Sequence, residues 1–126
     1  MKKAVVTDKA PKAIGPYSQA IISGKLVFTS GQIAIDPATG NLETGSIEKQ
    51  AHLVFKNLAA VLEAAGSGLE KAIKVTVFLK DMNNFAKVND VYMQYFKGVF
   101  PARSAVEVAR LPKDVDIEVE AIAYVE

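Results

Sequence analysis

Residues 47–65, IEKQAHLVFKNLAAVLEAA, carry the pattern that best predicts the fold of this chain. Their apolar side chains form one stripe with the period of an α-helix, about 3.6 residues. Thr44 or Ser46 can cap the start of this helix, and Gly66 stands where a left-handed C-terminal cap belongs. The stretch therefore predicts an amphipathic helix that buries one face.

The segments around this helix predict strands and one further helix. Alternating apolar residues at Ile73, Val75, Val77 and Leu79 indicate a strand. Further strands are expected at 3–7, 20–22, 26–29, 104–109 and 116–125, and a second helix at 85–96. The order β-β-β-α-β-α-β-β predicts an α+β domain over 1–126, with two helices on one face of a mostly antiparallel sheet.

Composition narrows the chemistry available to the chain. It has 126 residues, a net charge of +1, one His and no Cys. The near-neutral charge does not favour a nucleic-acid partner, and the residue types present cannot form a thiolate or multi-histidine metal centre. The apolar stretch at 4–6 is too short for a signal peptide and no run could span a membrane, so a cytoplasmic protein is expected.

The last predicted strand carries apolar side chains on both faces. Ile117 and Val119 belong to one face, whereas Glu118, Ile122 and Tyr124 belong to the other. Two helices cover only one side of a sheet, so apolar groups on the second side have no cover within the chain. We expect a homo-oligomer that packs these faces together. A monomer with scattered exposed apolar residues is the alternative.

Several residues are candidates for chemistry, each with a plain structural alternative. Arg103 could bind a carboxylate or phosphate through its rigid guanidinium, or it could be a surface arginine that pairs with a carboxylate at a helix end. If an oligomer buries the second face, the charge of Glu118 needs a partner or a raised pKa, which is the setting of a general base or a water-positioning group. The alternative is an ordinary edge-strand glutamate at the surface. Ser30-Gly31 could present a hydroxyl and backbone N–H groups, or form a bulge. Tyr17 could wall a pocket or pin its loop.

These residues fall in segments that together closely resemble the RidA (YjgF) family of reactive intermediate, or imine, deaminases. The resemblance covers nearly the whole chain. Its motifs occur in order at the family's spacing: AIGPYSQ at 13–19, TSGQI at 29–33, KVTVFLKD at 74–81, FPARSAVEVARLP at 100–112 and IEVEA at 117–121.

The resemblance implies a chorismate-mutase-like homotrimer with active sites between subunits. It implies hydrolysis of 2-aminoacrylate/2-iminopropanoate and 2-iminobutanoate to 2-oxo acids and ammonia, without a cofactor or metal. Arg103 would hold the substrate carboxylate, and Glu118 would position and activate water.

The resemblance assigns the remaining residues to substrate binding. Ser30 and Gly31 would contact the reacting end, Tyr17 would close the pocket from its own or a neighbouring subunit, and Asn89 would lie near the site. Ala105 stands where many members carry Cys, and its backbone can still make the family's contacts. The alternatives are a regulatory module that binds small carboxylates and an RNA-cleaving translation inhibitor.

Overall fold

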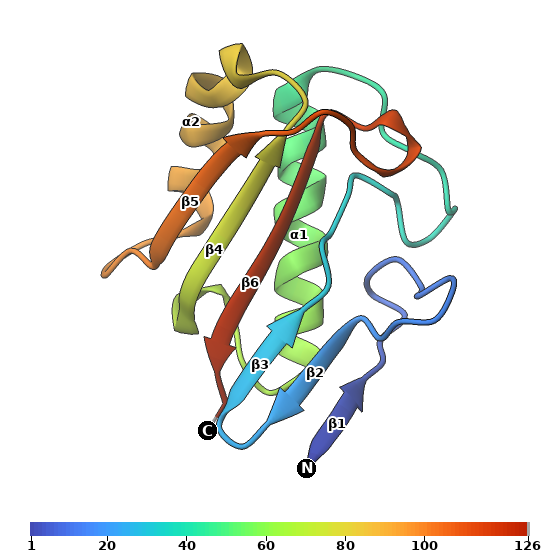
Figure 1. Cartoon of the computed structure of the whole chain (residues 1–126), viewed down its shortest axis with the longest axis vertical. Helices are drawn as coiled ribbons and strands as arrows, with labels where there is room; N and C mark the ends of the chain where they lie inside the picture. The colour runs from blue at the N-terminus through green and yellow to red at the C-terminus, as the bar shows by residue number, and fades with distance from the viewer. Residues whose placement is uncertain (126) are drawn as a thin grey trace.

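The computed structural model describes residues 1–125, and it confirms the predicted α+β class and order of elements (Figure 1). The strands are β1 (Lys2–Val5), β2 (Ala20–Ser23), β3 (Leu26–Thr29), β4 (Ala72–Leu79), β5 (Ala102–Glu107) and β6 (Ile117–Tyr124). The helices are α1 (Ile47–Ala64) and α2 (Phe85–Tyr95), and short 3-10 turns are η1 (Leu69–Lys71), η2 (Met82–Asn84) and η3 (Pro112–Asp114).

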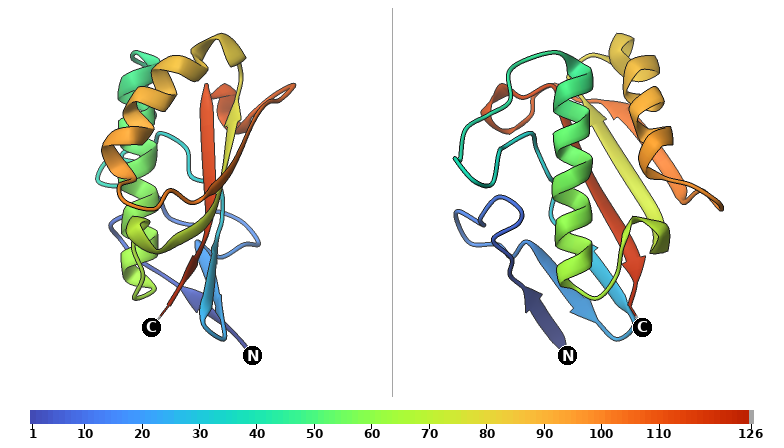
Figure 2. Two further views of the ribbon diagram at one scale, coloured as in Figure 1. Left: turned by 90° about the vertical axis from the view of Figure 1, so that its left-hand side faces the viewer. Right: turned by 180° about the vertical axis from the view of Figure 1, so that it is seen from behind.

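The strands form one sheet in the order β1-β2-β3-β6-β4-β5. Every neighbouring pair is antiparallel except β4 and β5, which run parallel. Parallel neighbours need a crossover connection, and α2 supplies it between β4 and β5. Both helices lie on the same side of the sheet (Figure 2). Strand β5 is therefore an edge strand with α2 beside it.

The core lies between α1 and the covered face of the sheet. The buried stripe of α1 includes Val54, Phe55, Leu58, Val61 and Leu62. It faces buried residues of the four inner strands, among them Val27, Val75, Val77, Leu79, Ile117 and Val119. Of the two predicted caps it is Ser46 that caps α1, because its side chain accepts a hydrogen bond from the Lys49 backbone N–H. Gly66 follows the helix with a φ of +80°.

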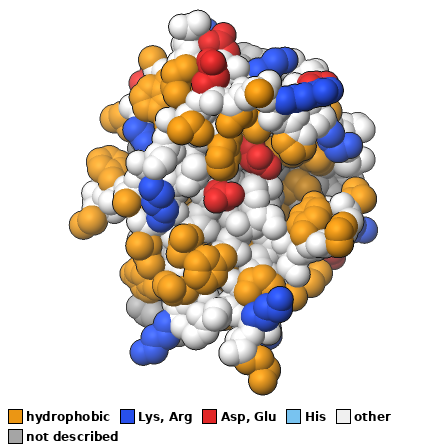
Figure 3. Space-filling view, viewed as in Figure 1, with side chains coloured by type: hydrophobic (Ala, Val, Ile, Leu, Met, Phe, Trp, Pro, Cys, Tyr) orange, Lys and Arg blue, Asp and Glu red, His pale blue; other side chains and the backbone are white. Residues whose placement is uncertain are grey.

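The second face of the sheet has no helix over it, as Figure 1 shows, and it is partly apolar. Phe28, Val106 and Tyr124 on this face are 41%, 41% and 40% exposed, and Ile122 and Phe78 are half-buried. The space-filling view of the same side shows hydrophobic side chains gathered in patches with acidic groups among them (Figure 3). The expectation of an uncovered, partly apolar face is confirmed.

Several strand predictions were inaccurate in detail. The strand predicted at 3–7 is β1, which ends at Val5. Ile73 was expected to share a face with Val75, but it is 44% exposed whereas Val75 is buried. The cause is a register shift between Ala72 and Lys74 in the pairing of β4 with β6, which breaks the alternation there. Strand β5 begins at Ala102 rather than 104, because its pairing with β4 already starts opposite Lys74.

Within residues 1–125, no helix is long and apolar enough to cross a membrane.

Candidate active site

Four of the predicted site residues line one cavity of about 570 Å³ beside strand β6. Tyr17 comes from the loop before β2, Ser30 and Gly31 follow β3, and Glu118 lies on β6. The other lining residues are Pro11, Lys12, Ile14, Gln19, Gln32, Ile33, Ile35, Pro112 and Lys113. We call this hollow the Glu118 cavity. Glu118 is the only lining residue that comes from a strand, and the others come from loops and from the turn η3.

The segment after β3 is fastened next to Glu118 by backbone hydrogen bonds. The Gln32 N–H donates to the Val119 carbonyl at 2.8 Å, and the Val119 N–H donates back to Gln32 at 3.1 Å. The Ser30 N–H donates to the Gln19 carbonyl at 2.9 Å, and the Ser30 hydroxyl donates to the carbonyl of Ser18. The Ser30 proton is therefore engaged, and this hydroxyl would meet a ligand only as a hydrogen-bond acceptor.

Gly31 is required here for space rather than for backbone conformation. A Cβ at this position would lie 2.5 Å from Glu118 Oε2 and 2.9 Å from Glu118 Cγ. The Glu118 side chain therefore passes directly over the Gly31 backbone. Sequence reasoning singled out Gly31 but could not identify this cause, because it depends on the pairing of two segments 87 residues apart (118 − 31).

Glu118 has the electrostatic character expected of a general base. Its side chain is half-buried on the uncovered face. Burial raises the pKa of Glu118 above its ordinary value, and the negative charge of Glu120 raises it further. A carboxyl group with a raised pKa takes up a proton more readily near neutral pH, which is what proton transfer to and from water requires.

Arg103 and Asn89 lie in a different hollow, of about 400 Å³, between β5 and α2. It is lined by Asn89, Tyr92, Met93, Phe100, Pro101 and Arg103. Arg103 Nη1 donates to Asn89 Oδ1 at 2.7 Å. Its Cζ lies 4.6 Å from the centre of the Tyr92 ring and 5.2 Å from that of Phe85. The predicted substrate contact Asn89 is thus a contact of Arg103.

One chain does not bring Arg103 and Glu118 together. In the sheet register Arg103 pairs with Val75, which is buried under the helices, whereas Glu118 pairs with Phe78 on the uncovered face. The two positions are also separated by three residues of β4, about 10 Å along the strand. A site that uses both side chains therefore needs two copies of the chain.

The remaining predicted residues are Ala105 and Tyr17. Ala105 pairs with Val77, is half-buried against the core and lines neither hollow. Tyr17 is 52% exposed, and its hydroxyl accepts a hydrogen bond from the Ile14 N–H at 3.4 Å. It pins its own loop and also lines the Glu118 cavity, so both interpretations of this residue apply.

Sequence reasoning missed Gln19, a buried residue that lines the Glu118 cavity. Its side chain accepts from the Thr7 N–H at 2.8 Å and donates to the Thr7 and Pro11 carbonyls at 3.0 and 2.8 Å. These bonds hold the loop that carries Tyr17. Gln19 directly precedes the strand that begins at Ala20. Nothing in the sequence around it indicates that this single amide side chain is buried.

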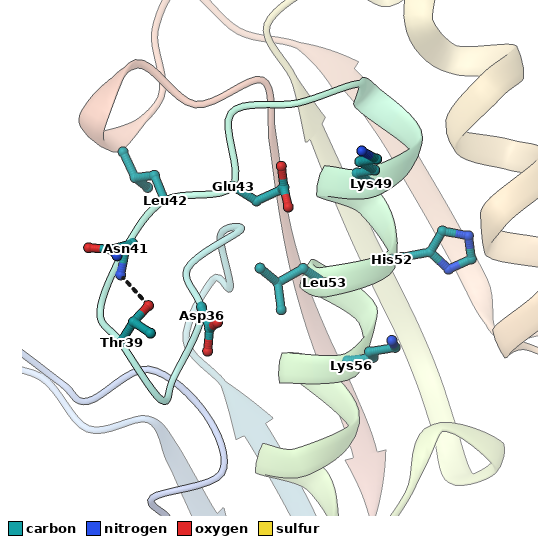
Figure 4. A pocket seen from close by; sticks show the side chains of 9 residues that line it. All are labelled: Asp36, Thr39, Asn41, Leu42, Glu43, Lys49, His52, Leu53 and Lys56. Atoms are coloured by element: carbon teal, nitrogen blue, oxygen red, sulfur yellow. Dashed lines mark hydrogen bonds between the residues drawn. The ribbon is translucent and has the colours of Figure 1, made fainter.

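A further hollow lies between α1 and the segment 36–43 (Figure 4). Its lining residues are Asp36, Thr39, Asn41, Leu42, Glu43, Lys49, His52, Leu53 and Lys56, none of which is a predicted site residue. His52 Nδ1 lies 2.9 Å from the Tyr95 hydroxyl. Within residues 1–125, no group of three or more His, Asp or Glu side chains could hold a metal ion.

Comparison with known proteins gives consistent matches along the chain. The sequence model of the Endoribonuclease L-PSP family matches residues 7–125. A RutC family protein of Pyrococcus horikoshii is 60% identical over 126 residues, which is 100% of both chains. The human protein named 2-iminobutanoate/2-iminopropanoate deaminase is 46% identical over 123 residues, covering 98% of this chain and 90% of the human one.

A solved structure similar to this one contains a ligand. It is the crystal structure of Escherichia coli TdcF with bound serine, which has a TM-score of 0.93 and 46% identity. The match covers 98% of this chain and 99% of that one.

Proposed function

The chain belongs to the Endoribonuclease L-PSP family, the RidA (YjgF) family, and from this premise we propose that it is an imine deaminase. Its substrates would be 2-iminobutanoate and 2-iminopropanoate, and its products 2-oxo acids and ammonia. The observation that carries the proposal is the Glu118 cavity, in which a half-buried carboxyl with a raised pKa stands beside Ser30 and Gly31. The relatives named as deaminases support the reaction class.

The reaction needs a held carboxylate and an activated water. Arg103 would grip the substrate carboxylate, which fixes the C=N carbon relative to Glu118. Glu118 would accept a proton from water as the water oxygen bonds to the carbon of the protonated imine, giving a neutral carbinolamine. Return of that proton to the nitrogen makes ammonia the leaving group. As the C–N bond breaks, the hydroxyl group gives its proton to Glu118 and becomes the carbonyl of the 2-oxo acid. A carboxyl with a raised pKa suits these proton transfers.

The assembly we propose is a homotrimer with sites between subunits. Arg103 and Glu118 lie on opposite faces of one sheet, so the edge strand β5 of one copy would have to meet the Glu118 cavity of the next. The uncovered face offers apolar surface for such contacts, with Phe28, Ile122 and Tyr124 on it. Burying this surface between copies would also supply the favourable free energy of association.

The test is an assay coupled to a threonine dehydratase, in which the decay of the released imine is followed with and without the protein. We expect faster release of 2-oxobutanoate with the wild type. Arg103→Ala should reduce the rate by orders of magnitude without loss of the folded oligomer. Full activity of that variant would overturn the assignment of Arg103 as the carboxylate clamp.

Glu118→Gln separates a deaminase from a carboxylate-binding regulator. If Glu118 activates water, the substitution should slow hydrolysis far more than it weakens binding of 2-oxobutanoate. A regulator would bind this ligand equally well with either residue and show no hydrolysis. The family's description also names an endoribonuclease. Ribonuclease activity that survives stringent purification and disappears with Arg103→Ala would favour that function instead.

A further inference from the structure

We propose that Tyr92 is a positioning residue, which with Phe85 and Asn89 holds Arg103 in one orientation while leaving its positive charge free for a carboxylate. The identity of the ligand rests on the proposed function. The role of Tyr92 goes beyond it, because this residue lies beneath the guanidinium rather than at the reacting atoms.

The three residues form one stripe on α2. Phe85, Asn89 and Tyr92 are four and three residues apart, so they share the helix face that meets β5. Asn89 Oδ1 accepts from Nη1 at 2.7 Å, and the rings of Tyr92 and Phe85 lie 4.6 and 5.2 Å from Cζ. The helix thus contacts the guanidinium through an amide and two aromatic rings.

All three contacts are with neutral groups. The only ion pair among the described residues joins Arg110 and Asp114, so no described carboxylate neutralises Arg103. Asn89 takes one of the five N–H donors of the guanidinium, and the others remain available. An aromatic face attracts a cation without cancelling its charge. These contacts therefore orient the guanidinium and preserve its attraction for an anion. We call Phe85, Asn89 and Tyr92 the Arg103 cradle.

Tyr92 is the rigid part of this cradle. Its ring is 3% exposed, stacks on Phe96 with centroids 4.3 Å apart, and meets Phe55 edge-on at 5.7 Å. Arg103, by contrast, is an exposed side chain on an edge strand, where a long side chain normally samples many rotamers. Packing against a fixed ring reduces the freedom that must be lost when a carboxylate binds.

The Tyr92 hydroxyl provides a matched control. It is buried and has no hydrogen-bond partner among the described residues. Tyr92→Phe therefore keeps the aromatic platform and removes only an unsatisfied group, whereas Tyr92→Leu removes the platform. If the ring positions Arg103, these two variants must differ.

The first measurement is calorimetric binding of 2-oxobutanoate to the intact oligomer. Tyr92→Phe should bind within twofold of wild type, and Tyr92→Leu should bind about tenfold more weakly. In an Arg103→Ala background Tyr92→Leu should cause no further loss, because there is no guanidinium left to orient. An equal loss in both backgrounds, or none in either, would overturn the proposal.

A second measurement needs no ligand. The side-chain ¹⁵N NMR signal of Arg103 should report an ordered guanidinium in wild type and Tyr92→Phe, and a mobile one in Tyr92→Leu. If Tyr92→Leu does not fold, Phe85→Leu serves instead with a smaller effect in the same direction. A wild-type Arg103 as mobile as in the variants would disprove the cradle. An ordered Arg103 in a protein that hydrolyses no imine would instead refute only the proposed function.

Discussion

The Glu118 side chain occupies the space that a Cβ at Gly31 would need. A single methyl group added at Gly31 is therefore a sharp probe of the site. Because even Glu118 Cγ lies 2.9 Å from the position of a Cβ at Gly31, the whole carboxylate arm must rotate away in Gly31→Ala. We expect the imine hydrolysis rate to fall at least tenfold, since positioning of the base is lost. The melting temperature should change little, because the arm ends in a cavity.

Gly68→Ala is the control for this substitution. A Cβ there would lie 2.5 Å from Glu70 Oε1, a similar clash with a carboxylate, but Gly68 lies beside η1 and lines neither hollow. It should retain wild-type turnover in the coupled assay. Equal activity of Gly31→Ala and Gly68→Ala would show that the orientation of Glu118 is unimportant.

The raised pKa of Glu118 predicts a dependence of stability on pH. The folded protein holds this proton more tightly than the unfolded chain, in which the pKa is near the ordinary value of 4.5. Stability is therefore lost as the pH rises from that value through the raised pKa, and the loss persists above it. Glu118→Gln removes this penalty, so it should be more stable than wild type at pH 7, with the difference vanishing below pH 4.5.

Urea denaturation across this pH range measures the effect. Glu120→Gln is the matched control, because Glu120 contributes only the second and smaller cause of the raised pKa. It should give a smaller gain at pH 7 than Glu118→Gln. A Glu118→Gln variant that is less stable than wild type at neutral pH would contradict the assignment of burial as the main cause.

At the scale of elements, the sequence predicted what depends on local periodicity and missed what depends on pairing. The stripe of α1 and the alternation of β6 were identifiable because each pattern repeats within its own segment. The exposure of Ile73 and the start of β5 follow from register with a neighbouring strand. The stripe formed by Phe85, Asn89 and Tyr92 surrounds Arg103 only because β5 places that side chain against α2.

The η3 turn carries strain that a substitution can relieve. Lys113 and Asp114 both have a φ of +56°, a region that non-glycine residues occupy at a cost. Lys113→Gly should therefore raise the free energy of unfolding by about 0.5–1 kcal/mol, the strain relief less the extra entropy of the unfolded chain.

Chemical denaturation of Lys113→Gly can be compared with that of Lys87→Gly. Lys87 is exposed within α2, where glycine costs about 1 kcal/mol, so the same exchange should have the opposite sign. A loss of stability in both variants would mean that the turn is not strained at Lys113.

At the scale of the whole molecule, the candidate site was predictable as a set of residues but not as an arrangement. The motifs point to Arg103 and Glu118, and apolar residues on both faces of the last strand point to an oligomer. Which face each side chain takes depends on how β5, β4 and β6 pair, and no periodicity within one segment reveals that. Because one chain places Arg103 and Glu118 on opposite faces of its sheet, a site that uses both residues would require an oligomer.

This placement predicts that two inactive variants can restore each other. If each site takes Arg103 from one subunit and Glu118 from the next, a mixed trimer of Arg103→Ala and Glu118→Gln contains some sites with both native residues. Random assembly of equal amounts should restore about one quarter of wild-type activity per site. The variants must be refolded together, or mixed under conditions where subunits exchange, and assayed by imine decay.

The matched control mixes the Arg103→Ala, Glu118→Gln double variant with either single variant, because no arrangement of those chains places both native residues in one site. These mixtures should stay as inactive as the separate proteins. If native mass spectrometry shows mixed trimers and activity is still absent, Arg103 of one subunit and Glu118 of the next do not share a site. Their separation on opposite faces of the sheet also excludes a shared site within one chain, and the carboxylate clamp would have to be sought among the cations that line the Glu118 cavity, Lys12 and Lys113.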